Sequence, residues 1–385
     1  MFRRVVVVAA VLLAAGVVLS GRGAGASVPS APRRAAGFDG RVRVAVAVGG
    51  TIYLGGAFTR ATDVDGRVLT RNRLTAVDAA TGALLPWNPN ADRTVYAMAV
   101  SGGTMYVGGD FTRVGGAARG RLAAVTAGGG GAVTAWNHRA DGRVRTLATS
   151  SSRLYAGGQF GAVDGAARSR LAAFSLASGA LDAGWRPAAD GPVHALRVGL
   201  SGTWVYVAGL FTRLGGDPAR AYLGAVDAAG GAVDPRFAAR VGFPVHAVTT
   251  TATSVYGAGD GLGGQLGAWT TAGAAKFPTL QTDGGGQAIA VIGAEVYLGG
   301  HFGNICPAGT RLDGAGRSVC AGAGTSRRKL LSVDAASGRP TAWNPSANSA
   351  LGVFAMAPTA AGGLAAGGDF TQVGGAATRR LALFG

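Results

Sequence analysis

Short runs of alternating apolar and polar residues, separated by glycine-rich turns, follow one another along most of the chain. In the clearest copy of this pattern, residues 95–100 and 104–107 alternate on either side of the turn Ser101-Gly102-Gly103. A glycine pair follows, then an apolar run at residues 121–125 and a further segment that reaches Trp136. Period-two alternation over about four to eight residues, bounded by glycine, is typical of β-strands. Each copy of the pattern therefore predicts four strands.

The pattern recurs at a regular spacing. Its second strand carries a tyrosine in six copies and an alanine in a seventh: Tyr53, Tyr106, Tyr155, Tyr206, Tyr256, Tyr297 and then Ala365. The tyrosines are 41 to 53 residues apart, which is the period of four-stranded propeller blades and longer than that of helical solenoids. Gly occurs 68 times in 385 residues and Glu only at Glu295, a composition that favours strands and turns. The sequence predicts an all-β fold, a seven-bladed β-propeller of four-stranded blades over residues 37–385.

The two ends of the repeat region complement each other. The chain ends at residues 381–385, which match a third strand, so the last copy lacks its fourth strand. Gly37-Phe38-Asp39-Gly40 resembles the tail of a fourth strand, because Phe38 lies 49 residues before Trp87. We expect the N-terminal segment to complete the seventh blade and close the ring, which removes open sheet edges. Residues 27–36 are then a short leader before the propeller.

The first 26 residues differ from the rest of the chain. Phe2-Arg3-Arg4 gives a basic start, residues 5–19 form an apolar run, and Ala24-Gly25-Ala26 matches a small-x-small cleavage site. This order predicts a secretory signal peptide at residues 1–26. The apolar run is shorter than the ~20 residues that a spanning helix needs, so we expect no stable membrane insertion; an uncleaved anchor is the alternative. The protein is expected to be secreted or associated with the cell surface.

Two cysteines, Cys306 and Cys320, lie in an insertion at residues 304–324 within the sixth copy. In an exported protein such a pair predicts a disulfide that closes the loop. The pair alone lacks the four ligands of a structural zinc site. No metal is therefore predicted at this loop.

The net charge is +17, and nearly all of the positive charge is arginine. Such a surface attracts polyanions. Many of the basic residues recur just before the third strand of each copy: Arg71 and Arg73, Arg119 and Arg121, Arg168 and Arg170, Arg220, Arg327 and Lys329, and Arg380. Two hypotheses remain open: a structural arginine copied from blade to blade, or a basic face that binds an anionic cell-wall polymer, lipid headgroup or acidic partner. Export and the lack of interleaved exposed aromatic residues disfavour nucleic acid.

One position in the innermost strand varies around the predicted ring, while the residues beside it are small or apolar in nearly every copy. Its occupants are Arg43, Tyr96, Arg145, His194, His246, Gln287 and Phe354. Innermost strands line the central channel of a propeller, so these side chains are candidates for a ligand site at one channel mouth. The alternative is that they cap the channel or pack between blades. His194 and His246 are adjacent in the ring, but two imidazoles without a third ligand make a poor metal site.

The other polar residues give little support for catalysis. Most aspartates recur at repeat positions, and Asp110, Asp260 and Asp369 are interpreted as turn formers or partners of the repeated arginines. No two carboxylates suggest the facing pair of a glycosidase, and the sequence has no Gly-x-Ser-x-Gly motif. His138 and His301 are expected at the surface. Asp63-Val64-Asp65-Gly66 is at most a weak Ca²⁺ site because it lacks a full ligand set, so no cofactor is predicted.

The string Tyr106-Val107-Gly108-Gly109-Asp110-Phe111-Thr112, followed by Arg121-Leu122-Ala123-Ala124-Val125, resembles the delta-60 repeat propellers. The resemblance covers residues 37–385. Proteins of that group are secreted or surface-exposed bacterial β-propellers without a common enzymatic activity. The resemblance implies a non-catalytic extracellular domain for adhesion or scaffolding, and it brings no catalytic residues to carry over.

Two enzyme families offer an alternative. The glycine pair after a tyrosine-bearing strand, with a tryptophan further on, is similar to a kelch blade, and the copper radical oxidases are kelch-like enzymes. Those enzymes need a tyrosine cross-linked to a cysteine plus histidine ligands, whereas both cysteines here lie in one loop. The segment at residues 76–82, followed by Trp87, is similar to the docking repeat of quinoprotein dehydrogenases. Those proteins have eight blades and acidic calcium ligands, which this sequence does not show.

The sequence therefore favours a secreted, monomeric, non-catalytic β-propeller that binds or scaffolds an extracellular protein, a polysaccharide or an anionic cell-envelope polymer. An extracellular kelch-like or quinoprotein-like oxidoreductase, with its site at the channel mouth, is the alternative.

Overall fold

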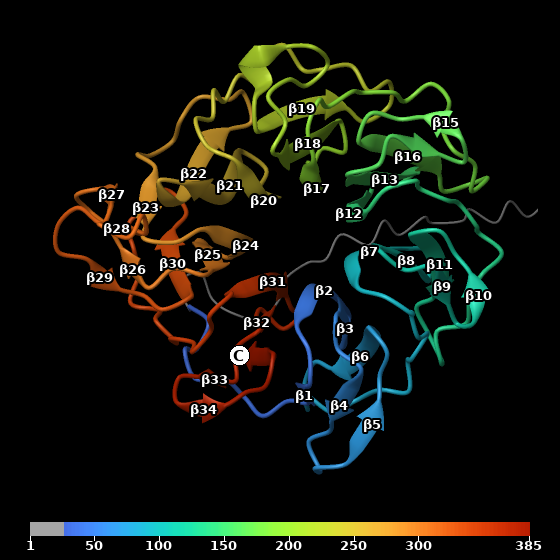
Figure 1. The fold of residues 1–385 in the computed structure, drawn as a ribbon, viewed down its shortest axis with the longest axis horizontal. Helices are drawn as coiled ribbons and strands as arrows, with labels where there is room; N and C mark the ends of the chain where they lie inside the picture. Colours follow the sequence, from blue (N-terminus) through green and yellow to red (C-terminus); the bar gives the residue numbers. More distant parts are fainter. Residues whose placement is uncertain (1–26) are drawn as a thin grey trace, which may run out of the picture.

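The computed structural model describes residues 27–385, and the expected signal peptide at residues 1–26 lies outside them. Strands follow one another around a central axis, and the chain runs around the ring in sequence order (Figure 1). The helical content of the described chain is one short 3-10 helix, η1 (Pro218–Arg220). The prediction of an all-β propeller is confirmed. No helix within residues 27–385 is long and apolar enough to cross a membrane.

Seven antiparallel sheets of the described chain each contain their own core of three strands. We call these sheets blades one to seven. From the centre outward, these cores are β2 (Val42–Val48), β3 (Thr51–Gly56) and β6 (Leu74–Asp78); β7 (Val95–Ser101), β8 (Thr104–Gly109) and β11 (Leu122–Thr126); β12 (Val144–Thr149), β13 (Arg153–Gly158) and β16 (Leu171–Ser175); β17 (Val193–Val198), β18 (Trp204–Gly209) and β19 (Leu223–Asp227); β20 (Val245–Thr250), β21 (Ser254–Gly261) and β22 (Gly263–Thr270); β24 (Gly286–Ile292), β25 (Glu295–Gly300) and β30 (Leu330–Asp334); and β31 (Val353–Pro358), β32 (Leu364–Gly368) and β35 (Leu381–Phe384).

Shorter strands lie in the loops outside these cores. They are β1 (Gly37–Phe38), β4 (Arg60–Thr62), β5 (Val68–Thr70), β9 (Arg113–Val114), β10 (Ala117–Ala118), β14 (Ala162–Val163), β15 (Ala166–Ala167), β33 (Gln372–Val373) and β34 (Ala376–Ala377). Most of them form small hairpins between the second and third strands of a blade.

The expected fourth strand is not a regular strand in the described blades, except in blade five. The outer segment instead makes a single bridge to the third strand, for example between Val125 and Val133. A repeated arginine adds a second attachment: Arg119 Nη2 donates to the Thr134 carbonyl at 2.8 Å, and Arg168 Nη2 to the Asp182 carbonyl at 2.9 Å. Arg71, Arg220 and Arg327 make equivalent bonds. Glycine and proline in these outer segments interrupt the ladder, so the recurrent arginines have a structural role.

Adjacent blades are joined by aromatic side chains. Trp87 Nε1 donates to the Thr126 carbonyl of the next blade at 2.8 Å, and Trp185 Nε1 does the same to Asp227 at 3.0 Å. Tyr155 Oη donates to the Ala228 carbonyl at 2.7 Å, and its ring packs on Trp185 with centroids 5.1 Å apart. A buried Tyr or Trp normally finds a hydrogen-bond partner. These pairs therefore fix each blade against its neighbour.

The N-terminal segment packs on the last blade. Arg33 N–H donates to the Leu383 carbonyl at 2.7 Å. In blade one, Leu85 N–H donates to the Ala76 carbonyl at the corresponding place. Val28 is 1% exposed in a cluster with Trp343 and Phe384. The segment at 27–36, expected as a leader before the propeller, therefore supplies the outer edge of blade seven.

Phe38 lies in a different register from the expected one. The Phe38 N–H donates to the Arg379 carbonyl of blade seven. The corresponding bond in blade one runs from Ala91 N–H to the Asn72 carbonyl. Phe38 thus corresponds to Ala91, four residues beyond the tryptophan position, and β1 pairs with β4 of blade one. The expected alignment with Trp87 is corrected, because these backbone bonds and not the aromatic ring set the register.

The insertion of blade six extends blade five. β23 (Leu280–Thr282) pairs with β22, and β26 (Asn304–Ile305) and β29 (Thr325–Ser326) continue the same sheet. β27 (Thr310–Leu312) and β28 (Ser318–Cys320) form a hairpin within the insertion. Cys306 and Cys320 form a disulfide with their Cα atoms 4.9 Å apart. The loop thus covers the region of blade five where the usual loop is missing.

Because the N-terminal segment packs on blade seven, a substitution that weakens this packing should lower the free energy of unfolding. Val28→Ala deletes two buried methyl groups and is expected to lower the free energy of unfolding by about 1–3 kcal/mol. Val68→Ala makes the same change at a side chain that is 60% exposed, and its effect should stay within about 0.5 kcal/mol. Urea unfolding of both variants measures the difference. Equal midpoints would contradict a role for the N-terminal segment in closing the ring.

Candidate functional site

Each of the seven candidate residues is the extra residue of a β-bulge. In blade one, Val42 pairs with Gly56 and Val44 with Gly55, so Arg43 has no partner in the ladder. The same register shift leaves out Tyr96, Arg145, His194, His246, Gln287 and Phe354 in the other blades. A bulge bends the strand and redirects the side chain of the extra residue. The variable position in the sequence is therefore one structural position repeated around the ring.

The second glycine of each pair makes this bulge possible. A Cβ atom at Gly158 would lie 2.1 Å from the Arg143 carbonyl oxygen, and one at Gly56 would lie 2.0 Å from that of Arg41. Any side chain there would collide with the backbone just before the bulge. The recurring glycine is thus explained by the close approach of the two innermost strands.

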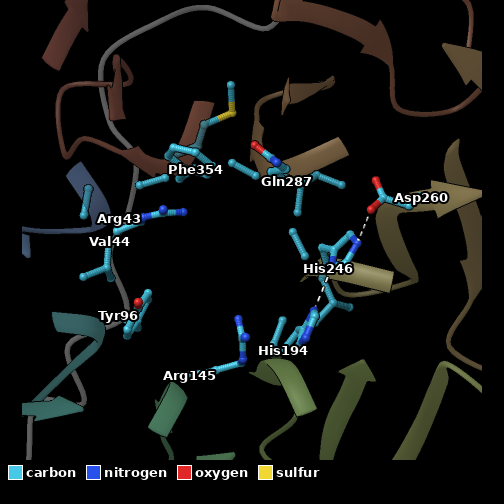
Figure 2. A pocket seen from close by; sticks show the side chains of 17 residues that line it. Arg43, Val44, Tyr96, Arg145, His194, His246, Asp260, Gln287 and Phe354 are labelled. Atoms are coloured by element: carbon cyan, nitrogen blue, oxygen red, sulfur yellow. Dashed lines mark hydrogen bonds and ion pairs between the residues drawn. The ribbon is translucent and has the colours of Figure 1, made fainter. Parts of the chain in front are cut away.

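The seven side chains surround a cavity of about 420 Å³ at the centre of the propeller. All seven are half-buried, and Figure 2 shows them arranged in a ring around an open space. The structure thus brings together all of the residues that the sequence singled out. Asp260 lines the same cavity.

The side of the cavity formed by blades one to three is cationic. Arg43 lies over the Phe354 ring, with Cζ 4.0 Å from its centroid. Neither Arg43 nor Arg145 makes a hydrogen bond or an ion pair with any residue in 27–385, and the Nε atom of each is buried without a partner. Burial lowers the pKa of both guanidinium groups, but an arginine stays protonated in proteins. Two uncompensated positive charges therefore face the cavity.

Tyr96 lies between these two arginines in the ring (Figure 2). Arg143 packs over its ring, with Cζ 4.7 Å from the centroid. Arg143 itself is paired with Asp110, through Nε–Oδ1 and Nη2–Oδ2 distances of 2.8 and 2.6 Å. The Asp110 carboxylate is thus already engaged by Arg143.

The opposite wall contains a chain of three polar side chains. His246 Nε2 lies 2.7 Å from Asp260 Oδ2, and His246 Nδ1 lies 2.7 Å from His194 Nδ1 (Figure 2). The two imidazole rings are stacked with centroids 4.8 Å apart. Burial, the neighbouring His246 and Arg145 lower the pKa of His194 to about 3. Burial has the largest single effect and raises the pKa of Asp260, but the hydrogen bond from His246 and the charges of the nearby histidines together outweigh it, so the pKa is lowered.

When both imidazoles are neutral, these contacts fix which ring nitrogen of His194 and of His246 carries the proton. Asp260 is a carboxylate and accepts from His246 Nε2–H, so His246 Nδ1 is the acceptor for His194 Nδ1–H. His194 Nε2 is left as a buried acceptor without a partner. This wall therefore presents two imidazoles with one carboxylate behind them.

The interpretation of Asp260 and His301 needs correction. Asp260 recurs at the position of Asp110 and Asp369 and was expected to form a turn or pair with an arginine, but it binds His246 at the cavity. The signal that could have found it is the loss of the phenylalanine loop just after it. His301 was expected at the surface, but it is half-buried, accepts from Gly285 N–H at 3.1 Å and lies 3.5 Å from the Gln287 amide nitrogen.

Other candidate ligands are occupied by the fold. Asp63 Oδ1 accepts from the backbone N–H groups of Val64 and Leu84, and Asp65 Oδ1 accepts from Arg67 N–H, so this segment forms the turn between β4 and β5. Within residues 27–385 no three His, Cys, Asp or Glu side chains are arranged to hold a metal ion. Both cysteines are in the disulfide and leave no thiol for a tyrosine cross-link.

The histidine pair predicts a pH effect on stability. The pKa of His194 is about 3 in the folded protein, against 6.5 for an ordinary histidine. Between these values the unfolded chain holds a proton that the folded protein lacks, so the free energy of unfolding falls as the pH falls, by up to about 1.4 kcal/mol per pH unit. Denaturant titrations should show a shallower pH slope for His194→Asn. Val68→Ala, at an exposed side chain that does not titrate, should keep the wild-type slope; equal slopes in all three proteins would contradict the assignment.

The comparisons with known proteins concern the fold. No protein-family model matches the chain, and no curated protein matches it. The chain is similar to the computationally designed Ika8 protein, with a TM-score of 0.48 and 14% identity over 90% of this chain and 97% of that one. It is also similar to the WD40 β-propeller domain of Doa1, with a TM-score of 0.53 and 12% identity over 93% of this chain and 95% of that one. At 12% identity the likeness to the Doa1 domain shows the fold alone, and that fold is a β-propeller.

Proposed function

We propose that this protein is a secreted, non-catalytic binding or scaffolding module that holds an anionic group of an extracellular partner at the channel mouth. The observation that carries the proposal is the pair Arg43 and Arg145, which line the cavity without an acidic partner. A guanidinium group offers planar, paired donors that match carboxylate, phosphate and sulfate oxygens. The partner is an extracellular polysaccharide, a protein or an anionic cell-envelope polymer.

The distribution of charge supports an anionic ligand. The whole chain carries a net charge of +17, which attracts polyanions toward the molecule. Several of the recurrent arginines donate to carbonyl groups of their own blade, whereas Arg43 and Arg145 have no such bond. The guanidinium donors of Arg43 and Arg145 are therefore not used by the fold and can bind a ligand anion in the cavity.

The roles of the aspartates support binding over catalysis. Asp39 Oδ1 accepts from the N–H groups of Thr59 and Arg60, and Asp92 does the same for Thr112 and Arg113. Asp141, Asp190 and Asp283 hold the corresponding loops. These carboxylates fix turns and do not face one another across the cavity.

Secretion is the second part of the proposal. The signal-like residues 1–26, the disulfide between Cys306 and Cys320 and the resemblance to the delta-60 repeat propellers support it. A disulfide persists in oxidising, extracellular surroundings. We propose that the protein acts there as a monomer.

The double substitution Arg43→Gln, Arg145→Gln tests the binding site. Wild-type protein is expected to bind immobilised anionic polysaccharides or envelope polymers and not neutral ones. The double variant should bind at least about tenfold more weakly, because each lost charged hydrogen bond contributes about 1.5–3 kcal/mol. Biolayer interferometry at physiological salt measures both.

The matched control is Arg60→Gln, Arg328→Gln, which removes the same charge from two exposed side chains. It should bind nearly as well as the wild type. If both double variants lost affinity equally, attraction to the overall positive charge would explain the binding and the cavity would not be the site.

A further inference from the structure

A second basic cavity lies beside the channel mouth. It has a volume of about 370 Å³, and its charged lining residues are Arg73, Asp92, Arg93, Arg121, Arg143 and Asp110. Four arginines thus meet two aspartates in one groove. None of these residues belongs to the ring of bulge residues described above.

Both aspartates of the groove are occupied. Asp92 accepts from Thr112 and Arg113 through both of its oxygens, and Asp110 is bound by Arg143. Arg93 is exposed and makes no side-chain hydrogen bond or ion pair in the described chain. Four guanidinium groups against two carboxylates leave the groove with an excess of positive charge, and both carboxylates already have hydrogen-bond partners.

The other two arginines are anchored and still offer donors. Arg73 Nη1 donates to the Phe58 carbonyl at 2.8 Å, and Arg121 Nη1 donates to the Ala140 carbonyl at 2.9 Å. Each side chain uses one nitrogen for the fold, which leaves the remaining N–H groups of a five-donor guanidinium. Fixed side chains lose less conformational entropy on binding than free ones.

The groove adjoins the channel-mouth cavity at the contact between Arg143 and Tyr96. Residues 92–94 line the groove, and the same segment enters β7, where Tyr96 lines the cavity. Arg143 joins the two, because it lines the groove and packs over the Tyr96 ring at 4.7 Å. Positive side chains thus follow one another from Arg43 and Arg145 at the axis out to Arg93.

The walls of the channel-mouth cavity differ in charge. Arg43 and Arg145 lie on one side, on either side of Tyr96, whereas His194, His246 and Asp260 lie on the other side (Figure 2). A dianionic group in this cavity would face the Asp260 carboxylate, which disfavours it. A single negative charge next to neutral, hydrogen-bonding atoms suits both walls, and the Tyr96 and Phe354 rings offer flat surfaces for packing.

We propose that the channel mouth and the adjoining groove form one binding path for a linear acidic polysaccharide, whose successive sugar carboxylates are bound by Arg43 and Arg145 at the mouth and by Arg73, Arg93 and Arg121 in the groove. This inference rests on the proposed function and narrows its ligand to a chain of monoanionic sugars. The neutral hydroxyl groups of the sugar at the mouth face the histidine wall. A polyphosphate chain is also a linear polyanion, but its charges lie closer together and it brings no hydroxyl-rich ring.

The test is a length series with a groove variant. Isothermal titration calorimetry would use galacturonic acid, its di-, tri- and tetramers, the neutral galactose trimer, and polyphosphate of similar length. The trimer is expected to bind at least about tenfold more tightly than the monomer, which exceeds the threefold statistical gain of three equal units. Arg93→Gln should weaken the trimer about three- to tenfold and leave monomer binding unchanged, whereas Arg328→Gln should change neither.

The outcomes separate this inference from the proposed function. If the trimer bound no better than the statistical gain allows, or if Arg93→Gln had no effect on it, the path through the groove would be refuted while anion binding at the mouth would stand. If polyphosphate bound more tightly than every uronic acid oligomer, the ligand class would be wrong. If no anion bound in a way that depended on Arg43 and Arg145, both the inference and the proposed function would fall.

Discussion

The close approach of backbone to backbone at the second glycine of each pair is the constraint on which the site depends. In every blade, a Cβ atom on that glycine would lie 1.8 to 2.6 Å from the carbonyl oxygen of the residue directly before the innermost strand. The contact is possible only for glycine, and it accompanies a bulge that leaves one residue without a ladder partner. That residue has no directly opposed residue on the neighbouring strand, so its side chain can vary without disturbing a cross-strand pair. Each blade thus has one bulge position whose residue type is not set by strand pairing. Repeated around the axis, these positions form a ring of variable side chains.

The repeat explains why the candidate site could be predicted from the sequence. Residues that recur serve the blade, and Arg43, His194 and Phe354 differ at a position where the surrounding pattern is constant. Asp260 could not be found in this way, because it occupies a recurrent aspartate position and its contact with His246 depends on the bulge geometry. The register of Phe38 was missed for a similar reason: the sequence shows the aromatic spacing, but backbone hydrogen bonds decide the pairing.

The arginines show how the same residue type takes two roles in one fold. The repeated arginines donate to carbonyl groups of the outer segments, where glycine and proline leave the sheet poorly paired, and they replace the missing fourth-strand ladder. Arg43 and Arg145 are positioned by bulges and have no carbonyl within reach. Composition alone cannot separate these roles, because a net charge of +17 contains both. The hydrogen-bond partners separate them and locate the charge that is free to bind a ligand.

The most direct test of this account is nitrogen-15 NMR of the arginine Nε–H groups during titration with galacturonic acid oligomers. The resonances of Arg43 and Arg145 can be assigned from the corresponding single Arg→Gln variants. The account predicts that these two signals shift first and saturate together, while those of exposed arginines such as Arg328 remain in place. Uniform small shifts across many arginines, or no shift at Arg43 and Arg145, would contradict the claim that the bulge residues form an anion-binding site.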